Sequence, residues 1–113
     1  MNESRRDTRY SYRTRIRLET ANGSILEGMM SNFSLGGTLV ETEPLPVFGE
    51  KVKLRVVLPG VPDECVIPCF VRWIKEDEGV GLQFESLRPI EVWALNKLKR
   101  ALAAYQSSGQ NPS

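Results

Sequence analysis

The feature of this chain that most restricts its fold is a series of short strand-like runs between residues 16 and 84, separated by Gly, Pro, Asn and Asp. In the clearest run, residues 51–58, valines and leucines alternate with lysines and an arginine, and this period of two is typical of a half-buried β-strand. Weaker or longer runs of the same kind lie at residues 15–20, 25–32, 37–42, 64–74 and 80–84. Short strands at this spacing predict an antiparallel sandwich or barrel.

Local signals add a turn, an irregularity and a helix to this pattern. Asn22-Gly23 predicts a hairpin turn between the first two runs. Pro68 lies inside the longest run and has no backbone N–H to donate, so we expect an edge position or a bulge there. After Phe84 the period becomes helical, with Pro89 at the first helical position. The apolar positions of this predicted helix are Ile90, Trp93, Ala94, Leu98, Ala101, Leu102 and Tyr105.

The sequence therefore predicts an all-β fold: a six-stranded antiparallel β-barrel with a C-terminal α-helix. The expected domain spans residues 1–106, with a flexible basic arm at 1–12, the barrel at 13–85 and the helix at 88–106. The polar tail at 107–113 is expected to be disordered.

Composition narrows the possible functions. The 113 residues carry a net charge of only +1, so no overall field favours binding to duplex nucleic acid or to an anionic membrane, and the short apolar runs predict no membrane insertion. There is no histidine, so the commonest general base is missing, and Cys65 and Cys69 are too few to complete a metal site. We read them as buried thiols, and we expect no enzyme activity, no metal and no cofactor. Without a signal peptide or an apolar span, a cytoplasmic location is expected.

Two polar segments stand out against the strand pattern. Residues 5–17 hold six arginines and one aspartate, and Arg5 and Arg9 lie four positions apart in the expected arm. Between the second and third runs lies the segment 32–37 (NFSLGG), in which Asn32 and Ser34 point the same way if the backbone is extended. Its glycines let the backbone come close to a ligand.

In this order, the two segments resemble the RxxxR and [D/N]xSxxG motifs of the PilZ family. Val71-Arg72-Trp73, followed by residues 79–84 (GVGLQF), resembles the closing hairpin of that family, so the resemblance covers about residues 4–105. Asn32 stands where Asp is commoner, and a second RxxxR at Arg9 and Arg13 leaves the register of the first motif open.

The resemblance implies a cyclic di-GMP receptor that changes conformation on binding and signals to a protein partner. The ligand-binding residues that it implies are Arg5, Arg6, Arg9, Asn32, Ser34, Gly36, Gly37 and Trp73. Guanidinium groups can pair with phosphate, fork onto a guanine edge and stack on a base, which suits this ligand. Trp73 either borders a guanine or belongs to the core, and the other arginines of the first run are expected to face solvent.

Other readings of the same residues stay open. The basic residues can be a solvated tail, and the glycine-rich segment an ordinary hairpin. The domain can also be a PilZ-like protein-interaction module without a ligand, or a single-strand nucleic-acid binder in which Tyr10 and Tyr12 stack on bases. We expect a monomer or a weak dimer, with Leu95, Lys99 and Arg100 on an exposed helix surface open to an effector protein.

Overall fold

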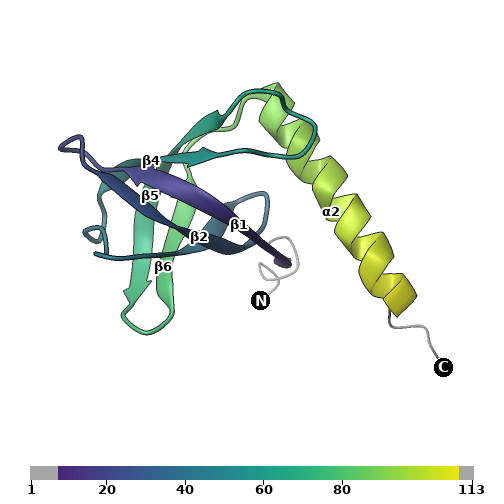
Figure 1. Cartoon of the computed structure of the whole chain (residues 1–113), viewed down its shortest axis with the longest axis horizontal. Helices are drawn as coiled ribbons and strands as arrows, with labels where there is room; N and C mark the ends of the chain where they lie inside the picture. The colour runs from purple at the N-terminus through teal and green to yellow at the C-terminus, as the bar shows by residue number, and fades with distance from the viewer. Residues whose placement is uncertain (1–7, 110–113) are drawn as a thin grey trace.

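The computed structural model describes residues 8–109 as a six-stranded closed antiparallel barrel followed by one helix (Figure 1). The order of the strands around the barrel is β1-β2-β3-β6-β5-β4, and β4 closes the barrel against β1. The elements are β1 (Tyr10–Glu19), β2 (Ile25–Phe33), β3 (Gly37–Thr42), β4 (Lys51–Val56), β5 (Cys65–Lys75), β6 (Gly79–Phe84) and α2 (Pro89–Gly109). The predicted fold class is confirmed.

The start of β1 corrects one expected boundary. This strand begins at Tyr10 and not at Arg15, so residues 10–12, expected in a flexible arm, belong to the barrel. The reason is aromatic packing: the ring centroid of Phe33 lies 5.9 Å from that of Tyr10 and 6.3 Å from that of Tyr12. At the other end of the chain, α2 runs to Gly109, so residues 107–109 of the expected disordered tail are helical.

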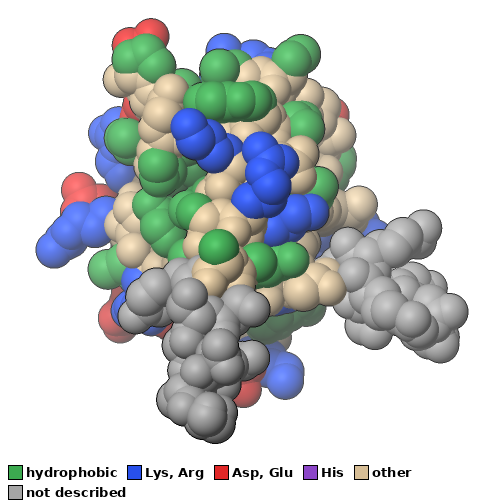
Figure 2. Space-filling view, turned by 90° about the vertical axis from the view of Figure 1, so that its right-hand side faces the viewer, with side chains coloured by type: hydrophobic (Ala, Val, Ile, Leu, Met, Phe, Trp, Pro, Cys, Tyr) green, Lys and Arg blue, Asp and Glu red, His purple; other side chains and the backbone are tan. Residues whose placement is uncertain are grey.

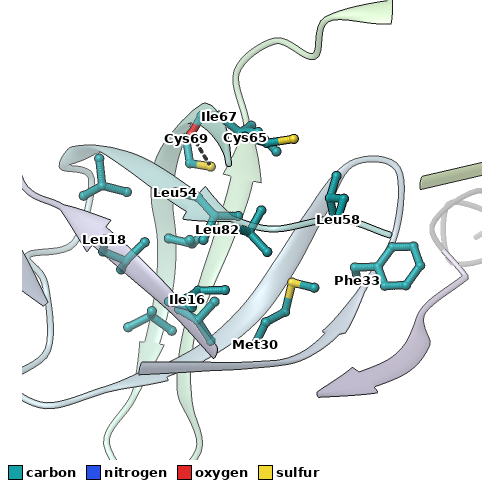
Figure 3. Close-up of a cluster of buried hydrophobic side chains, with 14 of the residues drawn as sticks. Ile16, Leu18, Met30, Phe33, Leu54, Leu58, Cys65, Ile67, Cys69 and Leu82 are labelled. Atoms are coloured by element: carbon teal, nitrogen blue, oxygen red, sulfur yellow. Dashed lines mark hydrogen bonds between the residues drawn. The ribbon is translucent and has the colours of Figure 1, made fainter. Parts of the chain in front are cut away.

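The core fills the barrel with side chains from every strand (Figure 3). Leu18, Leu54 and Val71, at alternating positions of their strands, are at most 1% exposed, as the period of two predicts. Cys65 and Cys69 lie in this core as free thiols, which confirms the reading of buried cysteines. Burial raises the pKa of the Cys69 thiol to about 12.

Pro68 occupies neither an edge strand nor a bulge, contrary to expectation. Pro68 directly precedes Cys69, and Cys69 pairs with Phe84 in the last pair of the β5–β6 ladder at this end. Pro68 therefore lies just past the end of the β5–β6 ladder, and its carbonyl accepts a hydrogen bond from the backbone N–H of Glu85 at 2.7 Å. Of the two ladders that flank β5, the one with β6 carries a bulge, between Val71 and Trp73.

The helix is held to the barrel by its first turns. Glu91 is fully buried, and its carboxylate accepts hydrogen bonds from both the backbone N–H and the side chain of Arg88, which closes the helix start in the manner of a capping box. Ala94 and Leu95 enter the core beside Glu91. The expectation that Leu95 lies on an exposed surface is therefore wrong, because its side chain is 2% exposed.

The outward face of α2 differs from the predicted apolar stripe. Ile90 and Trp93, expected to face the barrel, are more than 40% exposed, and the Trp93 ring lies against Gly60 in the loop after β4. Lys97 Nζ lies 5.1 Å from the centroid of the Trp93 ring. Figure 2 looks onto the side where α2 lies and shows basic and hydrophobic side chains intermingled, with acidic ones only at the margins. Within residues 8–109, no helix is long and apolar enough to cross a bilayer.

Candidate ligand-binding site

The two polar segments that the sequence separates by more than twenty residues meet in the structure. β1 pairs with β2 so that Tyr10 lies opposite Phe33 and Ser11 opposite Asn32. Arg9, which immediately precedes β1, is thereby brought to the end of β2. Its Nη1 donates a hydrogen bond to Oδ1 of Asn32, at 3.1 Å. The arginine segment and the NFSLGG segment thus form one site.

The loop between β2 and β3 is held by its own hydrogen bonds. The backbone N–H of Ser34 donates to the carbonyl of Gly37 at 2.8 Å, and that of Gly36 donates to Ser34 Oγ at 3.1 Å. The carbonyl of Gly36 accepts from the backbone N–H of Phe84, which ties the loop to β6. Ser34 is only 2% exposed, so its first role is to shape the loop, although its hydroxyl proton is not used in this bond.

Gly36 and Gly37, the two glycines of this segment, have different structural roles. A Cβ at Gly37 would collide with the backbone carbonyl oxygen of Leu82, so this position must be glycine for β3 to lie against β6. Gly36, by contrast, is exposed at the rim, where its lack of a side chain keeps the backbone open to a ligand. The expectation that Gly36 lets the backbone come close to a ligand therefore stays a prediction. Gly37 instead allows β3 to pack against β6.

The opposite wall of the site comes from the bulge in β5. Val71 pairs with Leu82 and Trp73 pairs with Gly81, so Arg72 is an extra residue without a partner in the ladder. Val71 points into the core, while Arg72 and Trp73 are both exposed on the outer surface. A Cβ at Gly81 would collide with three atoms of the Trp73 indole, which shows that the five-membered ring lies directly over that glycine.

These parts enclose a hollow of about 320 Å³ on the outside of the barrel, which we call the site hollow. It is lined by Arg9, Ser34, Gly36, Gly37, Arg72, Trp73, Gly81, Leu82 and Gln83. Its lining contains two arginines and no carboxylate, so it favours an anionic ligand. Among the described residues no group of His, Cys, Asp or Glu is arranged to hold a metal ion.

Most of the predicted site residues come together here. Ser34, Gly36, Gly37, Trp73 and Arg9 line the site hollow, and Asn32 is hydrogen-bonded to Arg9 beside it. Arg5 and Arg6 lie outside the described residues.

The structure bears on two questions that the sequence left open: whether Trp73 is a core residue, and which arginines form the RxxxR motif. Trp73 is not a core residue, since it is 37% exposed and lines the site hollow. Arg13 is not in the lining, and its Nη1 lies 3.9 Å from Oε2 of Glu41 on the barrel surface. Arg9 belongs to both registers of the arginine motif, and the first register stays a prediction because Arg5 lies outside the described residues.

Sequence reasoning missed Arg72, Gln83 and Gly81 as lining residues. Strict alternation along β5 puts Trp73 on the same side as the buried Val71, and only the bulge at Arg72 turns it outward. Nothing in the local sequence predicts that bulge. The one available signal was an arginine within an otherwise apolar run, directly before a tryptophan.

The fold and the site define a small closed barrel with an arginine-lined hollow, free of carboxylates, on its outer surface. The model of the PilZ domain matches residues 3–104, so the chain belongs to the PilZ domain family. Domains of this family generally bind cyclic di-GMP, and they are typically receptor domains without catalytic activity.

A solved structure supports the fold. The crystal structure of the PilZ domain of CeSA from a cellulose-synthesizing bacterium is similar, with a TM-score of 0.63 and 21% sequence identity, over 84% of this chain and 97% of that one. At this identity the likeness shows the fold alone. A search of curated proteins gave no match to the chain.

Proposed function

We propose that this chain is a cyclic di-GMP receptor that changes conformation on binding and passes the signal to a protein partner. The observation that carries the proposal is the hydrogen bond between Arg9 and Asn32, which joins the two family motifs at the rim of the site hollow. The lining of that hollow supplies positive charge without a compensating carboxylate.

The chemistry of the rim suits a cyclic dinucleotide. A guanidinium has five N–H donors, and the bond to Asn32 engages one of the five donors of Arg9. The remaining donors can pair with a phosphate or with the O6 and N7 atoms of guanine. Gly36 lets the ligand approach the loop backbone. Our proposal extends to Arg5 and Arg6, which the phosphates draw to the same rim, and this movement is the conformational change.

The signal leaves through protein contact in this proposal. Two surfaces are available: the rim of the site hollow, which the bound ligand alters, and the outward face of α2 with Trp93, Lys97 and Arg100. The second surface replaces the one expected around Leu95. We propose a monomer or a weak dimer, since the described part of this face carries the cations Lys97 and Arg100 beside Trp93.

The nucleic-acid reading is weakened by the aromatic residues on which it depended. Tyr10 and Tyr12 are half-buried and pack against Phe33, so their rings do not stand free as stacking platforms.

Isothermal titration calorimetry with purified protein and cyclic di-GMP tests the proposal. Arg9→Ala is expected to weaken binding about tenfold to hundredfold, because it removes charge-assisted hydrogen bonds of about 1.5–3 kcal/mol. The melting temperature should change little, since Arg9 is exposed.

The matched control is Arg15→Ala, which removes an exposed arginine of β1 that does not line the site hollow. This variant should bind like the wild type. Absence of any heat from the wild type at tens of micromolar ligand overturns the proposed function, and equal losses in the two variants argue for unspecific attraction of charge.

A further inference from the structure

We infer that Arg72, together with Trp73, forms a base-reading element that makes the site hollow select guanine over adenine. This inference rests on the proposed function, since it names the part of a cyclic dinucleotide that this wall of the site recognises. Arg72 belongs to neither of the two motifs at the opposite rim. Three features of the wall carry the inference.

The first feature is the way the bulge presents Arg72. As the unpaired residue of the β5–β6 ladder, Arg72 points outward beside Trp73. Bulges of this kind often re-aim a side chain next to a functional site. Among the described residues no ion pair or side-chain hydrogen bond engages Arg72, and no carboxylate lines the hollow that it faces. Its donors are therefore available to a ligand.

The second feature is the support beneath Trp73. The five-membered ring of its indole lies over Gly81, where any Cβ would collide with it. The backbone of β6 thus backs one side of the ring, and the indole is 37% exposed beside the site hollow. A rigid aromatic surface of this kind stacks on a base of any identity, because every base has a π-face. Trp73 supplies affinity for a base without choosing it.

The third feature is that Arg72 can make the choice. A guanidinium only donates hydrogen bonds, and guanine presents two acceptors, O6 and N7, along one edge. Adenine presents the N7 acceptor and an amino donor there, so one half of the fork meets a donor instead of an acceptor. Gln83, on the neighbouring strand β6, carries both a donor and an acceptor and suits either purine. The preference for guanine therefore depends on Arg72.

This arrangement divides the site into two ends. Arg9, fixed by Asn32 at the motif end, faces the phosphates, whereas Arg72 and Trp73 at the bulge end hold a base. Loss of Arg9 should weaken binding of any cyclic dinucleotide. Loss of Arg72 should weaken binding of the guanine ligand in particular.

The test is calorimetric titration of the full chain with cyclic di-GMP and with cyclic di-AMP. Arg72→Ala is expected to weaken cyclic di-GMP binding about tenfold to hundredfold, the discrimination of one bidentate base contact. Arg72→Gln, whose amide complements adenine, should lower the ratio of cyclic di-GMP affinity to cyclic di-AMP affinity by at least about tenfold. Arg15→Ala is the control, and circular dichroism verifies the fold of each variant.

The outcomes separate this inference from the proposed function. If the wild type binds cyclic di-GMP and Arg9→Ala loses it, but Arg72→Ala binds within about twofold of the wild type, the inference alone is wrong. It is also wrong if Arg72→Gln loses cyclic di-GMP without any relative gain for cyclic di-AMP, since Arg72 then holds a phosphate. Failure of the wild type to bind cyclic di-GMP overturns both.

Discussion

Two hollows on the surface of this barrel are lined by arginines, and they differ in what surrounds those arginines. The site hollow contains Arg9 and Arg72 and no carboxylate. A second hollow of about 230 Å³, which we call the strand hollow, lies over β1, β2 and β4. It is lined by Arg15, Ile16, Arg17, Glu27, Gly28, Arg55, Val56, Val57 and Glu64.

In the strand hollow two of the three arginines, Arg17 and Arg55, form ion pairs within the fold. Arg17 Nη2 lies 2.7 Å from Glu64 Oε2, and Arg55 bridges Glu19 at 2.7 Å and Glu64 at 3.5 Å. The hydrogen bond from Arg55 holds the pKa of Glu19 below its usual range, and the hydrogen bond from Arg17 does the same for Glu64. At the site hollow, the side chain of Arg9 is hydrogen-bonded to the neutral amide of Asn32 instead of to a carboxylate.

From this difference we expect that an arginine is available to a ligand where the fold brings no counter-charge to it. Arg9, just before β1, lines the site hollow, and Arg15 and Arg17, within β1, line the strand hollow, although these side chains are chemically identical. Their surroundings differ because the segment before β5 brings the carboxylate of Glu64 to Arg17, whereas the NFSLGG segment and β6 bring glycine and amide groups to the hollow that Arg9 lines.

The largest effect is expected from giving the site hollow the carboxylate that it lacks. Gln83→Glu places a negative charge among its lining residues, where it pairs with the arginines and repels the phosphates of a ligand. Repulsion of this kind costs several kcal/mol, so cyclic di-GMP affinity should fall more than about a hundredfold in calorimetry. Gln83→Met, of similar size and uncharged, should retain most of the affinity. Equal losses in the two variants contradict the electrostatic account.

A smaller effect is expected where an arginine is paired with a buried carboxylate. Glu91→Ala removes the partner of Arg88 at the start of α2 and should lower the free energy of unfolding by about 1.5–3 kcal/mol, measured by urea denaturation. Glu78→Ala is the control, because Glu78 and Lys75 form a pair of the same spacing that is exposed on a hairpin. That change should be nearly neutral. If Glu78→Ala lowers the free energy of unfolding as much as Glu91→Ala does, the burial of the Glu91 carboxylate is not the reason for the loss.

The smallest effect is expected in the strand hollow, and it should depend on pH. Because the folded-state pKa of Glu64 is lowered, its pairing stabilises the fold above the unfolded pKa and is lost as the pH falls through the folded value. Glu64→Gln should therefore unfold at slightly lower urea concentration than the wild type at pH 7, and the gap should close from about pH 5 downward. Glu27→Gln is the control, because Glu27 lines the same hollow and has no ion pair among the described residues, and this variant should unfold at nearly the wild-type urea concentration at pH 7. A gap for Glu64→Gln that widens in acid contradicts the pairing.

The sequence predicted the barrel because its evidence is local and repeated. The period of two at residues 51–56 and the Asn22-Gly23 turn report backbone conformation directly, and both lie where the structure has β4 and the β1–β2 turn. The ends of elements were less predictable. Tyr10 belongs to β1 because Phe33 packs against its ring, and that contact joins residues far apart in the sequence.

The candidate site was predictable where motif residues carry it and not where packing does. Arg9, Asn32 and Gly36 were predicted from the resemblance of their segments to the family motifs, and the structure brings these three residues to one place. The sequence did not decide whether Trp73 belongs to the core or borders a ligand. Strict alternation along β5 places its side chain inside the barrel, and only the bulge turns it outward.

By itself, then, the sequence determined the strands, the helix, the buried thiols and the two polar segments, because each depends on residue type and near neighbours along the chain. Only the tertiary structure decided which arginines have a counter-charge. It also decided that Leu95 is buried while Trp93 is exposed, and that Arg72 faces the site. These properties depend on strand register, on a bulge and on carboxylates from distant segments. No local pattern encodes them, because the free energy of a charge is set by its neighbours in space.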